Sequence, residues 1–187
     1  NRLTMIDVDN LDQNGDPVAT TYDLDNSVFS GRIYDIAYNT EENMFYAVES
    51  PGTNGGNGTV HRIDLSEVSQ GGDPIIESVP ISGTLYGDEM AAGMAKGAYG
   101  AVFLDGDGNL FYGLNRGDHD LDSSTAVEGG IFQVHADFDA GIAYSEFKAE
   151  AQTTGSNDGT VDPRSVDPFA ETDTEATVLI RDPSLES

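Results

Sequence analysis

Aspartate residues recur at alternating positions in several short stretches of this chain. The stretches with this spacing are Asp7-Val-Asp9, Asp12-Gln-Asn14-Gly-Asp16, Asp23-Leu-Asp25, Asp105-Gly-Asp107-Gly-Asn109 and Asp118-His-Asp120-Leu-Asp122. Alternating carboxylate and amide oxygens in a tight loop can converge on one point, and a hard cation such as Ca²⁺ requires oxygen ligands of this kind. The spacing therefore predicts several bound calcium ions.

The run Asp118, Asp120 and Asp122 is the sharpest candidate for a calcium loop. It lies in a long insertion, residues 115–129, between two strand-like segments. The matching insertion earlier in the chain carries only Glu49, near its start. A solvated acidic loop is the alternative interpretation. Because the acidic run is present in only one of the two insertions, it indicates a specialised use, and we expect these aspartates to bind metal.

Asp105, Asp107 and Asn109 form a second set of candidate metal ligands. They resemble the start of a calcium loop, but the EF-hand pattern fails at its sixth and twelfth positions, which are Leu110 and Arg116. Asp-Gly and Gly-Asn are also strong signals for a hairpin turn, and a plain turn is the favoured interpretation at this place.

Asp12, Asn14 and Asp16 form a third set, grouped around Gly15. The spacing suits metal ligation and equally suits a hairpin turn, in which Asn, Asp and Gly are the preferred residues. Both interpretations stay open.

The charge of the chain is strongly acidic. Its 187 residues include 34 Asp and Glu against 8 Lys and Arg, which gives a net charge of -26. This balance argues against a nucleic-acid partner, since phosphate binding needs Lys and Arg. It also argues against anionic membrane surfaces, and no apolar run is long enough to insert into a bilayer. Self-repulsion destabilises a compact state, so we expect folding to be linked to cation binding.

The length fits one domain, residues 1–187, and the chain begins at Asn1 as if excised from a longer polypeptide. Cysteine is absent, which excludes disulfides and thiolate zinc sites. Weak calcium loops fill at the millimolar calcium found outside cells. We therefore expect an extracellular protein.

Strand-like runs dominate the sequence and predict an all-β, mainly antiparallel fold. These short runs are rich in β-branched and aromatic residues and are bounded by Gly, Asn and Asp; they cover residues 32–38, 44–48, 59–64, 75–81, 100–104, 109–114, 130–135 and 176–180. Helical periodicity is scarce. We expect one short helix over Asp88 to Lys96 and a single turn over Ser66 to Ser69.

An internal repeat organises these runs. Residues 36–48 match residues 102–114, with identities at Asn43 and Asn109, Phe45 and Phe111, and Tyr46 and Tyr112; the run 60–63 then matches 131–134. Each copy predicts a three-stranded meander with a hairpin turn and then a long insertion, 49–59 or 115–129. We expect the meanders to pack face to face as a β-sandwich-like body, and a partial propeller is the alternative.

The segment from Ala151 to Thr177 is polar and reads as a long ordered loop or strap. Metal ligation by Asp158, Asp162 or Asp167 would be one way to order it, because a loop of this length in a compact domain is usually functional or disordered.

Motifs for catalysis are absent from the sequence. There is no Gly-x-Ser-x-Gly elbow, P-loop or dinucleotide fingerprint. The three histidines, His61, His119 and His135, share no metal-binding or catalytic spacing. We therefore expect a protein that is not an enzyme.

Four strings of the chain carry a family resemblance: Gly31-Arg-Ile-Tyr-Asp-Ile-Ala-Tyr38, Gly106-Asp-Gly-Asn-Leu-Phe-Tyr-Gly113, Gly129-Gly-Ile-Phe-Gln-Val134 and Gly155-Ser-Asn-Asp-Gly159. They resemble the calcium-dependent peptide-binding domain in the ligand-binding region of bacterial RTX adhesins, over roughly residues 30–160. The same strings are also similar to propeller-like repeats in other bacterial surface proteins.

The resemblance implies cell adhesion at the bacterial cell surface. Domains of this kind bind the C-terminal end of a target polypeptide on another cell, with calcium holding the ligand's carboxylates, and a cation with an open position would reverse the local negative field. The expected partners are such an extracellular polypeptide and the neighbouring domains of a long adhesin. The expected ligand-binding residues are Asp118, Asp120, Asp122 and Asp158. The alternatives are a calcium-dependent carbohydrate-binding module and a calcium-stiffened structural spacer.

Overall fold

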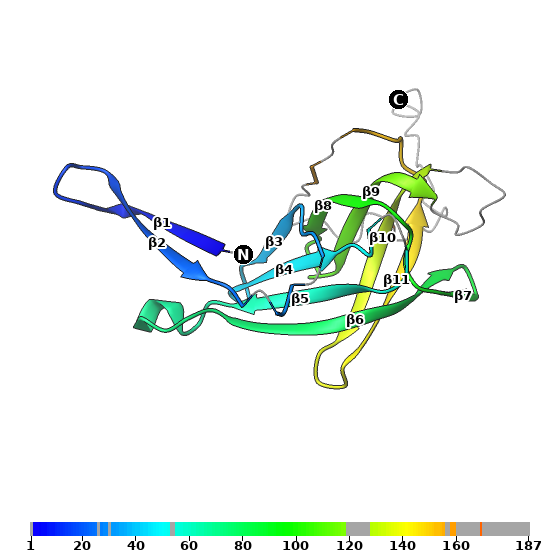
Figure 1. The fold of residues 1–187 in the computed structure, drawn as a ribbon, viewed down its shortest axis with the longest axis horizontal. Helices are drawn as coiled ribbons and strands as arrows, with labels where there is room; N and C mark the ends of the chain where they lie inside the picture. The colour runs from blue at the N-terminus through cyan, green and yellow to red at the C-terminus, as the bar shows by residue number, and fades with distance from the viewer. Residues whose placement is uncertain are drawn as a thin grey trace, which may run out of the picture.

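Strands build nearly all of this protein, as the computed structural model in Figure 1 shows. The structure describes residues 2–25, 27–29, 31–52, 55–118, 128–155, 158–159 and 169. Within these ranges the only helical element is one 3₁₀ turn, η1 (Val68–Gln70), and no helix has the length and apolarity needed to cross a bilayer. The predicted all-β, antiparallel fold is confirmed.

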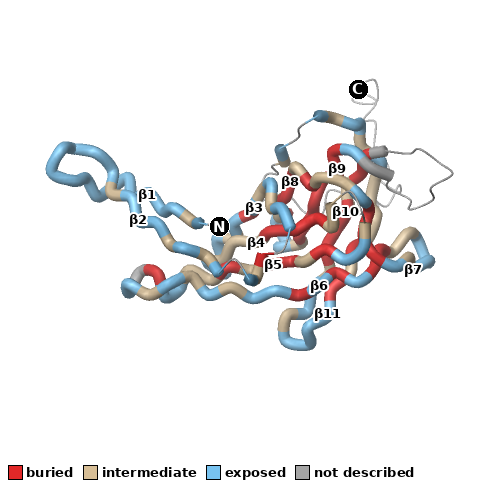
Figure 2. Tube along the Cα trace, viewed as in Figure 1, coloured by how far each residue is buried: buried red, intermediate tan, exposed pale blue. Residues whose placement is uncertain are grey.

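The N-terminal residues form a separate two-stranded sheet. Strands β1 (Arg2–Leu11) and β2 (Pro17–Asp23) pair antiparallel and project from the body as an arm (Figure 1). Most of the arm is exposed, as the pale blue tube in Figure 2 shows. Its base rests on the body, where Leu3 and Tyr22 border a small apolar hollow together with Phe45.

The body is one sheet of nine strands, and eight of them lie in the order β3-β4-β5-β6-β11-β10-β9-β8. The first four in chain order are β3 (Ile36–Asn39), β4 (Met44–Glu49), β5 (Gly58–Asp64) and β6 (Ile75–Tyr86). The last four are β8 (Ala98–Leu104), β9 (Leu110–Asp118), β10 (Glu128–Asp137) and β11 (Ile142–Ala149). The remaining strand, β7 (Glu89–Ala92), pairs with β6. Each half is an antiparallel meander of four strands. The predicted repeat is therefore confirmed, with one more strand in each copy than the sequence predicts.

The two meanders join edge to edge through their fourth strands. β6 and β11 run parallel, and the Thr84 and Ser145 hydroxyls lie 2.9 Å apart between them. The sheet curls until β3 lies beside β8, where the Asp35 carboxylate accepts a hydrogen bond of 2.7 Å from the Val102 amide. In place of two facing sheets, the chain therefore forms one nearly closed barrel.

The third strands of the two copies are β5 and β10. The strand pairing aligns them one residue away from the alignment that the sequence match predicts. Tyr46 faces Arg62 across β4 and β5, whereas Tyr112 faces Phe132 across β9 and β10. Arg62 therefore corresponds to Phe132, and the match of 60–63 with 131–134 is wrong by one position. A slip of one residue exchanges the inner and outer faces of a strand, so pairing by apolar character alone misplaced it.

The helix expected over Asp88 to Lys96 is wrong. Gly87 has a φ of 58° and, with Asp88, makes the two-residue turn of a hairpin between β6 and β7. Glycine at the first turn position is the signature of such hairpins. Gly93, with a φ of 81°, follows the end of β7. The expected turn after Ser66 is present as η1.

A stack of three aromatic rings lies in the barrel core, among aliphatic side chains. Tyr99, Tyr112 and Phe132 are fully buried, and Tyr112 stacks on both of the others, with ring centroids 4.3 and 5.0 Å apart. The Tyr99 hydroxyl donates to the Ala95 carbonyl oxygen at 2.5 Å. Burial raises the pKa of both tyrosines well above the usual value, so they stay neutral. The red segments in Figure 2 mark this core.

The described part of the predicted strap lies on the outer wall of the barrel. The Thr154 amide donates to the Asn115 carbonyl oxygen at 3.1 Å, and the Phe169 ring lies 5.4 Å from Phe111. Gly159 lies against Ala101, where a Cβ would approach within 2.7 Å. The strand expected over 176–180 lies outside the described residues.

Candidate functional site

The two ends of the barrel carry different kinds of loop. At the turn end are the hairpin loops 40–43, 105–109 and 138–141, and at the insertion end are the segments that follow β4 and β9. Both long insertions therefore leave the same end, as the repeat predicts. Surface loops held by a rigid sheet are common places for binding sites.

A hollow of about 760 Å³ opens at the turn end and is acidic. Its carboxylates come from three hairpins and are Glu41, Glu42, Asp107, Asp137 and Asp139. Among the described residues that line it, the one guanidinium is that of Arg62, which is paired with Glu77 and lies 4.5 Å from the centre of the Phe138 ring. We name this space the acidic hollow.

Tyr46 lines the wall of the acidic hollow and stays neutral beside its carboxylates. Its hydroxyl donates to Glu42 at 2.6 Å, and burial, together with the Glu42 carboxylate, raises the pKa of Tyr46 to about 12. The wall is thus rich in hydrogen-bond acceptors and negative charge, an arrangement that suits cations and hydroxyl-bearing ligands.

Asp105 organises its own loop instead of pointing into the acidic hollow. The carboxylate is 4% exposed and accepts hydrogen bonds from the Asp107 amide at 3.0 Å, the Asn109 amide at 2.8 Å and the Asn109 side-chain amide at 2.9 Å. The favoured hairpin-turn interpretation is confirmed. Asp107 and Asn109, by contrast, border the acidic hollow.

Asp12 repeats this pattern at the tip of the N-terminal arm. Its carboxylate accepts hydrogen bonds from the Asn14 amide at 2.8 Å and the Asp16 amide at 3.0 Å. These hydrogen bonds, that from Asp16 first, lower the pKa of Asp12. Gly15 adopts a φ of 86°, as Gly108 does at 81° in the other loop. The hairpin turn is present here too, and its exposed oxygens stay candidate ligands.

The described residues contain no group of three or more His, Asp or Glu side chains arranged as a metal centre. Asp118 ends β9 at the insertion end, where its backbone pairs with Glu128. Asp120 and Asp122 lie outside the described residues. Asp158 is exposed and precedes Gly159, which lies against β8, so its place is on the barrel wall. Calcium ligation by these residues stays a prediction.

A second hollow, of about 650 Å³, opens at the insertion end and has the opposite charge. Three of the chain's 8 Lys and Arg residues line it, namely Arg32, Lys96 and Arg116. We name this space the basic hollow. These cations are far apart in the sequence and follow no spacing rule, so sequence reasoning missed them.

A ladder of short backbone bridges brings the three cations together. Arg32 bridges to Ser50, Gly52 bridges to Gly97, and the neighbouring Ala98 pairs with Arg116. Gly97 has a φ of 138°, and a Cβ there would lie 1.9 Å from the Arg116 carbonyl oxygen. Only glycine permits this close approach of the two segments.

Sequence reasoning also missed a cluster of Glu49, His61 and Ser78, in which Glu49 and His61 are buried and Ser78 is exposed. The His61 ring nitrogens lie 2.8 Å from the Ser78 hydroxyl and 3.1 Å from the Glu49 carboxylate. His61 is fully buried beneath the Phe29 ring, and desolvation lowers its pKa. Serine, histidine and an acid are the groups of nucleophilic catalysis, but Ser78 borders neither hollow. The cluster joins β4, β5 and β6 on the outer face.

Comparisons of the chain with protein-family models, with curated proteins and with solved structures found no match.

Proposed function

We propose that this protein is a calcium-dependent adhesin module that binds the C-terminal end of a target polypeptide. The observation that supports this most is the basic hollow, which lies at the end where both insertions leave the barrel. A preformed concavity beside long surface segments on a rigid barrel is a typical ligand site. Its positive charge suits a terminal carboxylate in a chain that otherwise repels anions.

Calcium is proposed as the second part of the site. The acidic run begins at Asp118, two residues after Arg116, which lines the basic hollow. A calcium ion held by Asp118, Asp120 and Asp122, with Asp158 as a further ligand-binding residue, would add positive charge at this end. The net charge of -26 supplies a general demand for cations.

The proposed setting is the bacterial cell surface, outside the cell, with neighbouring domains of a long adhesin on either side. Millimolar calcium in that setting would fill loop sites of about 10⁻⁴ to 10⁻³ M affinity.

The test is a screen of displayed hexapeptides with free C-termini, in calcium and in chelator. Selected peptides should bind in calcium, and should lose most of their affinity when they are amidated or when calcium is removed. The triple variant D118N/D120N/D122N should lose the calcium effect. The variant D7N/D9N/D23N removes equal charge from the N-terminal arm and should retain it. A peptide affinity that changes neither on amidation nor on removal of calcium would overturn the proposal.

A carbohydrate ligand is the second candidate, and the acidic hollow favours it. Aromatic rings of Tyr46, Phe138 and Tyr144 line this hollow beside its carboxylates. Rings that pack on apolar sugar faces, beside acceptors for hydroxyl groups, are the usual chemistry of a sugar site. A glycan array probed in calcium would decide between them, since binding there and not to free C-terminal peptides would replace the first proposal.

A further inference from the structure

We infer that Arg32, Lys96 and Arg116 form a seat for one carboxylate group. The inference deepens the proposed function, because the carboxylate it would hold there is the terminal one of the partner polypeptide. The seat itself depends only on the described residues of the insertion end and not on calcium.

The charges of the basic hollow are available to a ligand. Arg32, Lys96 and Arg116 are all exposed, and none of them forms an ion pair with a carboxylate among the described residues. This is unusual in a chain with 34 Asp and Glu residues. Cations placed together repel each other, so three cations that lack a carboxylate partner in the described part of the chain would be stabilised by an anion that they share.

The side chains come from three segments that the backbone fixes in place. Arg116 is held further by a hydrogen bond of 3.2 Å from its Nε to the Thr154 carbonyl oxygen, and its Nη2 lies close to Gly155. The close contact at Gly97 sets the spacing between Lys96 and Arg116. The Arg116 guanidinium is therefore pre-organised, which lowers the entropy cost of binding an anion, and the backbone ladder fixes the positions from which Arg32 and Lys96 extend.

The lining of the hollow fits a carboxylate that carries an apolar group. Tyr34, Pro51 and Ala98 supply apolar surface next to the three cations. The last residue of a polypeptide has this chemistry, with a single negative charge beside a side chain. A dianion such as phosphate suits the same donors, but the field of a chain at -26 repels it about twice as strongly.

The test uses N-acetyl-trialanine with a free carboxylate, its C-terminal amide, and inorganic phosphate as probes, in chelator. Amide resonances of the isotope-labelled protein are followed by NMR. The free acid should shift Gly31, Gly52 and Gly97, while the amide should leave them unchanged. Arg32→Gln and Lys96→Gln should each lower the affinity for the free acid by up to about fivefold. Both residues are exposed, so unchanged resonances elsewhere will show that the variants fold.

Lys148→Gln is the matched control. Lys148 pairs with Glu146 on β11, so the variant makes the same change of charge away from the basic hollow. It should leave the affinity for the free acid unchanged. Equal weakening in Lys148→Gln, or equal binding of the acid and the amide, would overturn the seat. Tighter binding of phosphate than of the free acid would overturn the carboxylate assignment.

The two proposals fail separately. If polypeptide ends bind in a calcium-dependent way and Arg32→Gln and Lys96→Gln do not change their affinity, the seat is contradicted. The proposed function then still stands. Binding of the free acid at the seat, without any calcium-dependent binding of longer peptides, would remove the proposed function and leave the seat.

Discussion

Asp12 and Asp105 perform one local task in two environments. Each begins a hairpin loop, accepts hydrogen bonds from the amides two and four residues later, and precedes a glycine at the left-handed position. The carboxylate thus accepts hydrogen bonds from loop amides that have no partner on a neighbouring strand. Asp105 is buried and Asp12 is exposed, so the same bonds carry different weight.

Asp105→Ala should destabilise the protein by about 2 to 3 kcal/mol, because it removes the buried acceptor of three partly buried hydrogen bonds. Asp12→Ala, in the exposed copy of the loop, should cost much less. Urea unfolding of both variants measures the difference. If Asp105 serves the turn alone, its cost is the same in calcium and in chelator, and a cost seen only in calcium would show that Asp105 is a metal ligand.

His61 should make stability depend on pH. Desolvation is the main cause of its lowered pKa, while hydrogen bonding to Glu49 opposes it. The unfolded chain takes up a proton near pH 6.5 that the folded protein resists, so stability is lost as pH falls below about 6.5. The melting temperature of the wild type should fall more steeply between pH 7.5 and 5.5 than that of His61→Gln. His135→Gln is the control and should keep the wild-type slope. If the wild type itself shows a slope as shallow as that of His61→Gln, this role of His61 is contradicted.

At the scale of elements, the runs that the sequence located best have regular alternation and clear turn signals. Strands β4 and β5 each differ from the predicted run by one residue, since Asn43 and Asn57 mark where they begin. Strand β11 was missed because two of its buried positions are small, Ala143 and Ser145, which hides the apolar alternation. Strand β7 was read as a helix because four residues rich in Ala and Met resemble a helical turn.

The backbone ladder beneath the basic hollow should be sensitive to one glycine. Gly97→Ala would drive a Cβ into the Arg116 carbonyl and should destabilise by about 3 kcal/mol or more. Gly15→Ala is matched in having a positive φ but has open space around its Cβ, so about 1 kcal/mol is expected. Urea unfolding measures both, and equal costs would show that the close approach at Gly97 is not a constraint.

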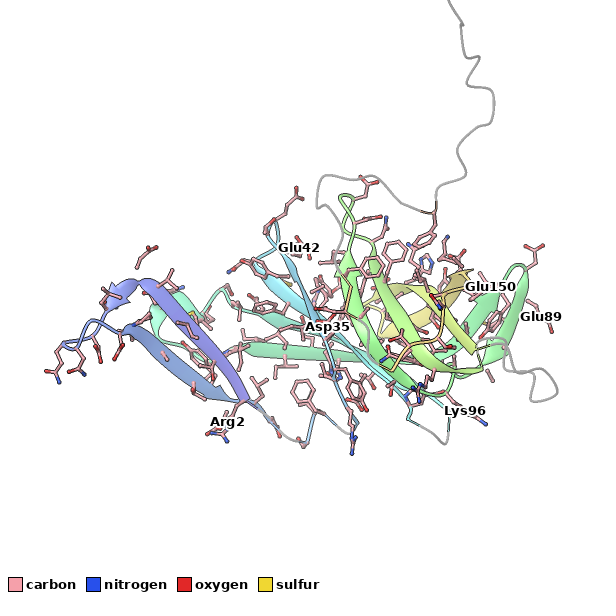
Figure 3. The ribbon with its side chains drawn as sticks, turned by 90° about the horizontal axis from the view of Figure 1, so that it is seen from above. Arg2, Asp35, Glu42, Glu89, Lys96 and Glu150 are labelled. Atoms are coloured by element: carbon pink, nitrogen blue, oxygen red, sulfur yellow. The ribbon has the colours of Figure 1, made fainter. Side chains whose placement is uncertain are left out.

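At the scale of the whole molecule, the barrel separates its charges. Figure 3 labels Glu42 and Lys96, which lie on opposite sides of the body, one beside the acidic hollow and the other beside the basic hollow. No sequence pattern shows this polarity, because it depends on closure of the barrel. Closure depends on the parallel pairing of β6 with β11, whose partners Thr84 and Ser145 are 61 positions apart.

Calcium should stabilise the whole protein beyond simple screening. At 10 mM calcium, one site of about 10⁻³ to 10⁻⁴ M affinity adds about 1.4 to 2.7 kcal/mol to the free energy of unfolding. The melting temperature in calcium should therefore exceed that in sodium or magnesium at equal ionic strength. Calorimetry measures it, and identical curves in the three salts would show that the acidic loops hold no specific calcium.

The separation of charge between the two ends of the barrel also affects how fast an anionic ligand binds and dissociates. At a distance, an anionic ligand meets a body of charge -26, and it feels the three cations only within a screening length of about 8 Å at physiological salt. Added salt weakens the long-range repulsion, which speeds arrival, and also weakens the local attraction, which speeds departure. Association and dissociation would then both accelerate with salt, so equilibrium affinity alone would conceal how strongly charge governs this contact.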